Sequence, residues 1–441
     1  MMNNLDDMND YIKKFKNQNN NSNQPFNNNE ILEKCNSNNS NFNSNQNIIA
    51  NMNNNNNFSN NMNNNIINFH KELNIKQDFS RQKFNSLNLE ENYSFSRYKK
   101  AINTGFKDLG NSSYLNSVFQ LLGSISEFAD YFLNPTNIKN IYLNLPKMQL
   151  SHLIQRLFVH LYPYPEKNEK EIYSPIYHLD YLNKHKIEKN PNSILDFIFK
   201  NLHNELNKLS NNIYMKIKPN IYELDNVILN GIENYRKLND SIISNLFNWF
   251  EIKESECIEC KQKSYLFENY TIFNLDILNS FNYYKINNIN NNRNNNCFSI
   301  YHCLDYKNII KKEELLYCNK CLKYESQLTS KIIYNFPRIL ICSLNRGVFD
   351  TNLMSIPFYI HDKITIKSMQ ESIKEYELTG IVSIYLDKNK YVSSCKSPVD
   401  LKWYFYNDEY IGNADFNAII KNHNEKKMFL PCLLIYKSIS A

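Results

Sequence analysis

Hydrophobic positions recur at helical spacing in two segments of the chain. The first segment, Ser112–Phe132, places apolar side chains three or four residues apart, at Leu115, Val118, Phe119 and Leu122. This spacing aligns the side chains on one face, so it predicts a helix, and Ser112 and Ser113 are suitable N-cap residues at its start. The second segment, Asn192–Leu209, predicts another amphipathic helix with the stripe Ile194, Phe197, Ile198, Leu202, Leu206 and Leu209.

The carboxyl-terminal half changes to short runs rich in β-branched and aromatic residues. Pro, Asn, Asp or Gly bounds each run, which is typical of strands. We expect strands at Ile332–Tyr334, Ile339–Leu344, Leu378–Leu386, Trp403–Tyr406 and Leu433–Tyr436. Helices followed by strands of a largely antiparallel sheet predict an α+β fold.

Asparagine dominates the beginning of the chain. About thirty of the first seventy residues are Asn, interrupted mostly by Ser, Gln and isolated apolar residues. Such a tract buries too little apolar surface to offset its conformational entropy, so we expect an Asn-rich disordered extension over residues 1–98 and a folded domain over residues 99–441. A second run, Asn287–Asn296, predicts an insertion loop within that domain.

Charge and cysteine content narrow the function classes. The formal charge of +6 is mild for 441 residues and forms no long basic run, which disfavours nucleic-acid binding. No apolar run reaches the ~18 residues that a bilayer span needs, and the first residues lack the apolar core of a secretory signal. Ten cysteines, four of them in C-x-x-C pairs, suit a reducing compartment, so we expect a cytoplasmic or nuclear protein without a membrane partner.

Those two C-x-x-C pairs predict a metal site. The pairs are Cys257–Cys260 and Cys318–Cys321, and together they supply the four thiolates of a tetrahedral Cys₄ zinc site. Such a closed site has no open coordination position, so its zinc would be structural. The alternatives are four unrelated thiols, or a site that no longer binds metal.

The segment Thr104–Phe132 resembles the opening signature of the ubiquitin-specific proteases, a family of cysteine deubiquitinases. The family signature has Gly, two residues, then Asn-Leu-Gly-Asn-Thr-Cys-Tyr-Met-Asn and an apolar helix, and it is matched by Gly105, Leu109, Gly110, Asn111, Tyr114, Asn116, Ser117 and Gln120. The resemblance covers about Ala101–Ser438. It implies a papain-like fold with a thumb at about residues 99–210, zinc-bearing fingers at about 245–335 and a palm with an antiparallel sheet at about 336–441.

The resemblance also assigns the catalytic positions, and three of them are altered. Ser113 replaces the nucleophilic cysteine, and Asp108 replaces the asparagine that steadies the oxyanion. Trp403–Asp408 resembles the family's Trp-x-x-aromatic-Asp/Asn-Asp motif, so Asn407 retains the residue that orients the histidine. At the position of that histidine stands Lys390. A hydroxyl is a weaker acid than a thiol, and a carboxylate repels the charge that an oxyanion hole must stabilise.

Three simultaneous changes predict an inactive homologue that acts as a scaffold for ubiquitin, a ubiquitin-like protein or a protein complex. The resemblance implies that Asp196 meets an arginine of ubiquitin's tail, whereas Ser193 has replaced a second carboxylate. The alternatives are an active deubiquitinase, or a Ser–Lys hydrolase that uses Ser113 and Lys390. We expect Lys390 to form an ion pair with Asp108 or with another carboxylate, which would argue against that dyad. A third reading places the function in the Asn-rich tract, through assembly.

Overall fold

The computed structural model describes residue 98 and residues 100–144, 149–163, 170–208, 224–287, 298–346, 351–370, 373–425 and 428–439. The predicted Asn-rich extension, apart from residue 98, and most of the predicted insertion lie outside these residues. Helices come first and sheets later, so the predicted α+β class is confirmed. No helix within the described ranges combines the length and apolar character needed to cross a bilayer.

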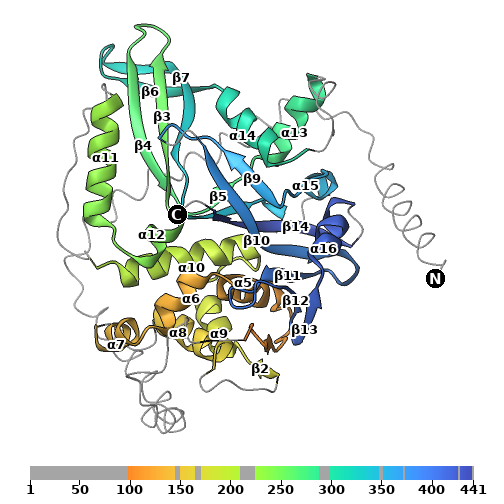
Figure 1. Cartoon of the computed structure of the whole chain (residues 1–441). Coiled ribbons are helices and arrows are strands. Elements are labelled where there is room, and N and C mark those ends of the chain that lie inside the picture. Colours follow the sequence, from red (N-terminus) through yellow and green to blue (C-terminus); the bar gives the residue numbers. More distant parts are fainter. Residues whose placement is uncertain are drawn as a thin grey trace, which may run out of the picture. The chain divides into compact units, whose positions relative to one another are not determined.

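The first part of the described chain is helical (Figure 1). Its helices are α5 (Ser113–Gly123), α6 (Ser126–Leu133), α7 (Pro135–Asn144), α8 (Leu150–Leu161), α9 (Ile176–Lys184) and α10 (Pro191–Leu206), and the short strands β1 (Thr104–Phe106) and β2 (Glu171–Tyr173) pair in parallel. The helix expected at Ser112–Phe132 is two helices, because the chain turns at Ser124, whose hydroxyl donates to Leu121 O at 2.7 Å. The helix expected from Asn192 is α10.

An eight-stranded sheet packs against α5 of this helical part. Its strand order is β13-β12-β11-β10-β14-β8-β5, and β9 also pairs with β10. Only the β5–β8 pair is parallel. The strands are β5 (Phe273–Asn274), β8 (Ile339–Ser343), β9 (Lys363–Ile366), β10 (Lys374–Tyr385), β11 (Lys390–Lys396), β12 (Trp403–Asn407), β13 (Tyr410–Ala414) and β14 (Phe429–Ser438). Four of the five expected strands overlap β8, β10, β12 and β14, and two of them, Ile339–Leu344 and Leu378–Leu386, end one residue beyond β8 and β10.

A four-stranded antiparallel sheet, ordered β4-β3-β7-β6, projects from the other end of the molecule (Figure 1). Its strands are β3 (Trp249–Cys257), β4 (Lys263–Tyr270), β6 (Lys312–Cys318) and β7 (Lys323–Asn335), and β7 contains the fifth expected strand. The connections between the main elements include α11 (Leu224–Leu238), α12 (Ile242–Phe247), α13 (Ile277–Ile286), α14 (Ile300–Ile309), α15 (Thr351–Ser355) and α16 (Phe416–Asn424).

Close packing brings the start of α5 against the large sheet. All of α5 is buried. A Cβ at Gly380 on β10 would lie 2.6 Å from Leu121 Cδ1, so glycine lets the helix approach the strand. The opposite face of this sheet packs into a separate core with α13, α14 and α16, which includes Ile381 and Tyr436. The helical part and the sheet therefore meet along α5 and β11.

Candidate active site

Ser113 lies at the amino-terminal end of α5, as predicted. Ser113 is the first residue of the helix and is only 3% exposed. Its Oγ accepts a hydrogen bond from the backbone N–H of Tyr391 on β11, at 3.1 Å. The loop before it needs two left-handed residues, Gly110 (φ 82°) and Asn111 (φ 59°), which glycine and asparagine adopt readily. The sequence thus places a hydroxyl between the helix and the sheet.

Asp108 stabilises this loop. Its Oδ1 accepts from Gly110 N at 3.1 Å and from Ser112 Oγ at 3.2 Å. Ser112 is the N-cap residue of α5, but its side chain makes no bond to the helix N–H groups. Instead Ser112 Oγ accepts from Leu109 N at 2.9 Å. The side chain of Asp108 therefore stabilises the turn as a hydrogen-bond acceptor and has no N–H group to offer an oxyanion.

Lys390 pairs with Asp408 and not with the expected Asp108. Lys390 Nζ donates to Asp408 Oδ2 at 2.9 Å, and their side chains are 24% and 7% exposed. The other oxygen, Asp408 Oδ1, accepts from Asn116 Nδ2 on α5 at 2.9 Å. The expected ion pair of Lys390 with a carboxylate is therefore present, but Asp408 provides it instead of Asp108, whose side-chain hydrogen bonds lie within its own loop. Asp408 thus connects β11 with α5.

Strand β1 contacts and stabilises the turn that contains Asp408. Asp408 has φ 51° and lies between β12 and β13, and its carbonyl oxygen accepts from Phe106 N at 2.9 Å. A Cβ at Gly105 would lie 2.6 Å from Glu409 O, so only glycine fits at this crossing. The side chain of Asn407 comes just before the turn, and its buried Oδ1 accepts no hydrogen bond from the described residues.

Sequence reasoning missed the parts that Asp408 and Asn116 play. Asp408 belongs to the quoted motif, but its neighbour Asn407 was assigned the orienting role. The available signal was the lysine itself, because a partly buried ammonium group without a carboxylate partner would cost free energy. That signal indicates that a carboxylate must lie near Lys390, but it does not say which one.

A groove of about 830 Å³ borders α10. Its lining includes Asn192, Ser193, Asp196, Lys200 and Tyr270. The predicted tail-binding residue Asp196 is exposed, and no described residue forms an ion pair or hydrogen bond with its carboxylate. The structure therefore places Asp196 in a groove wall, free to meet a ligand.

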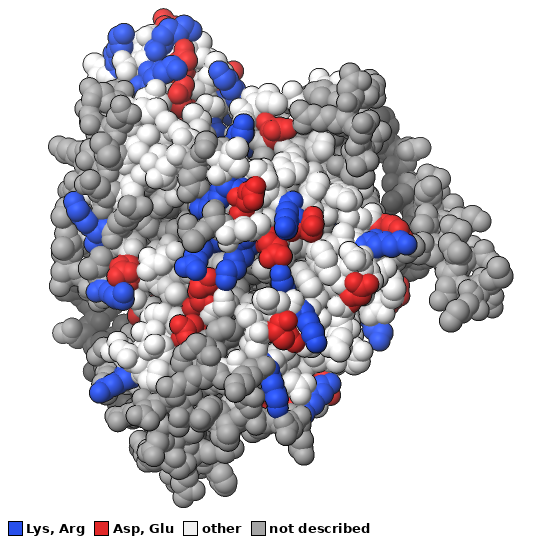
Figure 2. Space-filling model, in the orientation of Figure 1, with Lys and Arg blue, Asp and Glu red and all other residues white. Residues whose placement is uncertain are grey.

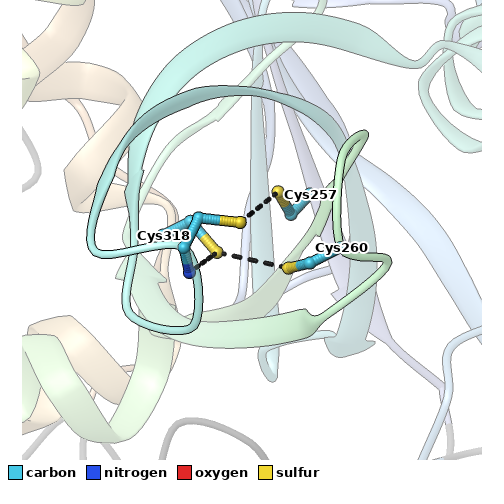
Figure 3. Close-up of side chains that lie close together, drawn as sticks. Cys257, Cys260 and Cys318 are labelled. Atoms are coloured by element: carbon cyan, nitrogen blue, oxygen red, sulfur yellow. Dashed lines mark hydrogen bonds between the residues drawn. The ribbon is translucent and has the colours of Figure 1, made fainter.

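The four predicted metal ligands come together at the end of the four-stranded sheet (Figure 3). Their sulfur atoms all lie within 4.8 Å of one another, with Cys257–Cys321 at 4.0 Å and Cys260–Cys318 at 3.5 Å. Four sulfurs ~2.3 Å from a tetrahedral zinc would be ~3.8 Å apart, so this donor set fits a metal ion.

The two cysteine pairs also share one backbone geometry. Lys261 and Leu322, which follow the second cysteine of each pair, have φ 59° and 58°. Their N–H groups donate to the carbonyl oxygens of Cys257 and Cys318, at 3.0 and 2.8 Å. The two turns therefore present their thiols in the same way, and the arrangement of the four sulfur atoms is suitable for holding a metal ion.

Charges of both signs are interspersed on the face shown in Figure 2. Lys and Arg side chains gather at the tip of the four-stranded sheet and again near the middle of the face in view, and Asp and Glu lie among them in both places.

Comparisons with known proteins support one family. The model of the ubiquitin carboxyl-terminal hydrolase family matches residues 104–436. Ubiquitin carboxyl-terminal hydrolase 15 of Bos taurus is 24% identical over 185 residues, and ubiquitin carboxyl-terminal hydrolase 12 of Saccharomyces cerevisiae is 27% identical over 187 residues. These alignments cover 39% and 38% of this chain but only 19% and 15% of the relatives' own lengths.

Solved structures share the fold. The yeast SAGA DUBm with an Sgf73 mutant superposes with a TM-score of 0.52 at 16% identity, covering 83% of this chain and 75% of that chain. The SAGA Ubp8/Sgf11/Sus1/Sgf73 DUB module bound to ubiquitin aldehyde gives a TM-score of 0.52 at 16% identity, covering 80% of this chain and 72% of that chain. The expected thumb, fingers and palm fold is confirmed by this match.

Proposed function

The chain belongs to the ubiquitin carboxyl-terminal hydrolase family, and on this premise we propose that it is a catalytically inactive member that acts by binding ubiquitin, a ubiquitin-like protein or a protein complex. The observation that carries the proposal is the ion pair of Lys390 with Asp408 at 2.9 Å. A general base needs a free lone pair, and an ammonium group that donates to a carboxylate has none. The same ion pair argues against a Ser–Lys hydrolase, which requires a neutral lysine.

The nucleophile position supports the same conclusion. A helix N-terminus lowers the pKa of a thiol enough to form a thiolate, but a hydroxyl is far less acidic and needs an efficient base. The recorded partner of Ser113 Oγ is the N–H of Tyr391, and none of the described histidines is bonded to it. Ser113 therefore lacks the means of activation.

The oxyanion position works against acyl transfer as well. A tetrahedral intermediate carries negative charge on its oxygen, and removing one donor to it raises the barrier by about 3 kcal/mol. Asp108 offers only acceptor oxygens to its surroundings. A carboxylate at this position adds repulsion to the missing hydrogen bond, so we expect no measurable hydrolysis.

Binding remains as the function that this scaffold supports. Solved structures of the same fold include complexes with ubiquitin aldehyde and with monoubiquitin. The groove beside α10 keeps the free carboxylate of Asp196. Ubiquitin is therefore the first partner to test.

The cysteine cluster completes the proposal. We infer that Cys257, Cys260, Cys318 and Cys321 hold a structural zinc, which the distances between their sulfur atoms support. When bound, the ion would tie the β3–β4 turn to the β6–β7 turn. Because a Cys₄ set leaves no open coordination position, the metal would stabilise the sheet without taking part in a reaction.

Two measurements on the purified full chain test the proposal. Cleavage of a fluorogenic ubiquitin substrate should not exceed that of the Ser113→Ala variant, while a titration should detect ubiquitin binding. Turnover by the unmodified chain that Ser113→Ala abolishes would overturn the proposed inactivity. Absence of binding to ubiquitin would instead remove ubiquitin as the partner and favour a complex of other proteins.

A further inference from the structure

A cavity of about 170 Å³ lies where the large sheet meets the four-stranded sheet. Its walls come from β5 and the residues after it, from α14, and from β6 and β7. Helix α14 lies beside β7 in Figure 1, so the cavity is enclosed between that helix and the four-stranded sheet. Of the residues that line it, only Asn274 also lines the groove beside α10. The cavity is therefore separate from the sites described so far.

The inner wall of the cavity is apolar. Phe273 and Leu275 are each 2% exposed, and Cys303 is 5% exposed. Burial raises the pKa of the Cys303 thiol to about 12, so this side chain is neutral near pH 7. A polar group placed against these side chains would lose its hydrogen bonds with water, so this wall favours an apolar part of a ligand.

Three lysines line the outer part of the cavity. Lys307 and Lys331, whose side chains are 25% and 38% exposed, both pair with Glu251, a carboxylate that is only 1% exposed. Lys307 Nζ also lies 5.7 Å from the centre of the Phe273 ring. The third lysine, Lys312, is exposed, and its ammonium group makes no hydrogen bond or ion pair with a described residue. Two ammonium groups are thus held in the wall, and a third is available to a ligand.

The two carboxylates that line the cavity already have donors from the protein. Glu314 Oε2 accepts from Lys253 Nζ at 2.6 Å. Asp276 caps α13, and its oxygens accept from Asn279 N at 3.2 Å and from Asn279 Nδ2 at 2.9 Å. Because Lys312 lacks such a partner, the open binding capacity of this rim is cationic and suits an anion.

The buried carboxylate of Glu251 is a second observation that indicates a ligand site. A buried ion network is often no more stable than apolar side chains of similar volume, because removing its charges from water costs free energy. Stability alone therefore gives no reason for Glu251 on β3. Holding the ammonium groups of Lys307 and Lys331 at a cavity wall does give one.

We propose that this cavity binds a small organic anion, with a carboxylate at the lysines and an apolar body against Phe273 and Leu275. A water molecule takes ~30 Å³ in the liquid, so the cavity has room for about six waters, or for a ligand of roughly six to ten non-hydrogen atoms. Simple aromatic and branched short-chain carboxylates have this size. The inference goes beyond the proposed function, because it needs neither Ser113 nor the groove beside α10.

The test follows the binding of 4-fluorobenzoate to the full chain by fluorine NMR. The titration should saturate with a Kd in the millimolar range, as expected for a ligand of so few atoms. The ligand stabilises only the folded chain, so a concentration about ten times the Kd should raise the melting temperature by about 2 °C. Benzylamine has a similar apolar body and the opposite charge, and it should not bind.

Matched variants locate the site. Lys312→Gln removes the available ammonium group, whereas Lys402→Gln removes that of an exposed lysine before β12 that does not line the cavity. We expect Lys312→Gln to weaken binding about fivefold and Lys402→Gln to leave it unchanged. Ile310→Trp enlarges a side chain in the cavity wall and should abolish saturable binding, and its melting temperature reports whether the variant folds.

Four outcomes would each overturn the inference. These are no saturable binding of 4-fluorobenzoate up to about 20 mM, benzylamine binding as tightly as the acid, equal affinity of Lys312→Gln and the unmodified chain, and unchanged affinity of a folded Ile310→Trp. If Ile310→Trp does not fold, Lys312→Gln still decides the question, because it changes an exposed side chain. Ubiquitin binding is measured separately, so the proposed function stands or falls on its own.

Discussion

Removing the charge of Asp408 should destabilise the domain without restoring any chemistry. Asp408 is 9% exposed and accepts two hydrogen bonds, from Lys390 and from Asn116. Asp408→Asn keeps an oxygen for Asn116 and tolerates the left-handed backbone, but it loses the ion pair. Breaking a buried pair can cost about 3–5 kcal/mol. Because the Lys390 side chain is 24% exposed and can turn toward water, we expect the free energy of unfolding to fall by a smaller amount, about 2 kcal/mol.

Urea denaturation followed by tryptophan fluorescence measures this loss, since Trp403 lies on the strand that precedes Asp408. Lys390→Met and the double variant complete a thermodynamic cycle, for which we expect a coupling of about 1–2 kcal/mol. Strictly additive effects would show that the pair contributes no stability and would refute the argument that it holds Lys390 charged. Hydrolysis gained by Asp408→Asn would instead contradict the expectation that no chemistry is restored, because it would mean that the released lysine acts as a base.

Three further outcomes are expected. Metal analysis of the purified chain should find about one zinc per chain, and Cys260→Ser should lower both the metal content and the melting temperature; an unchanged melting temperature after chelation would contradict a structural role. Burial lowers the pKa of His178 and of His423 to about 4. As pH drops from ~6.5 toward 4, these histidines become protonated in the unfolded chain before they do in the folded chain, so the free energy of unfolding should fall by up to ~3 kcal/mol for each group. His423→Gln should therefore flatten the pH profile of the melting temperature. Gly105→Ala should destabilise the domain by about 2 kcal/mol or more in urea denaturation, because the new Cβ would meet the backbone oxygen of Glu409 at 2.6 Å; a neutral result would mean that β1 can shift.

The sequence predicted those elements whose pattern is local. Apolar residues at helical spacing predicted α10 closely, because one stripe of that helix packs into the core. The same pattern predicted one helix where the structure has α5 and α6, since α6 continues the apolar spacing after a turn at Ser124. The helices α13 and α14 between the two sheets were not predicted. Each helix has only three buried positions, and one of the three is a serine in α13 and a cysteine in α14, so the apolar stripe gives little signal there.

The sequence predicted which residues form the candidate site, but it did not predict which side chains they bond to. Motif spacing placed Ser113 and Lys390, and the structure brings both to the contact between α5 and β11, where Tyr391 N donates to Ser113 Oγ. The choice between Asp108 and Asp408 depends on where a turn 292 residues away from Asn116 comes to lie, which spacing along the chain does not encode. Long-range hydrogen bonds of this kind follow from the packing of β1 against the turn.

The altered residues of the cleft have each acquired partners within it, and this has a consequence for any attempt at repair. Asp108 accepts from the loop that precedes Ser113, and Lys390 donates to Asp408. Replacing Lys390 alone by histidine would leave the Asp408 carboxylate with one partner fewer, and replacing Ser113 alone by cysteine would leave no base to form the thiolate. Catalytic groups that act as a unit give almost nothing when restored singly. If the chain is inactive as proposed, reversing any one of these changes alone should therefore restore no measurable hydrolysis.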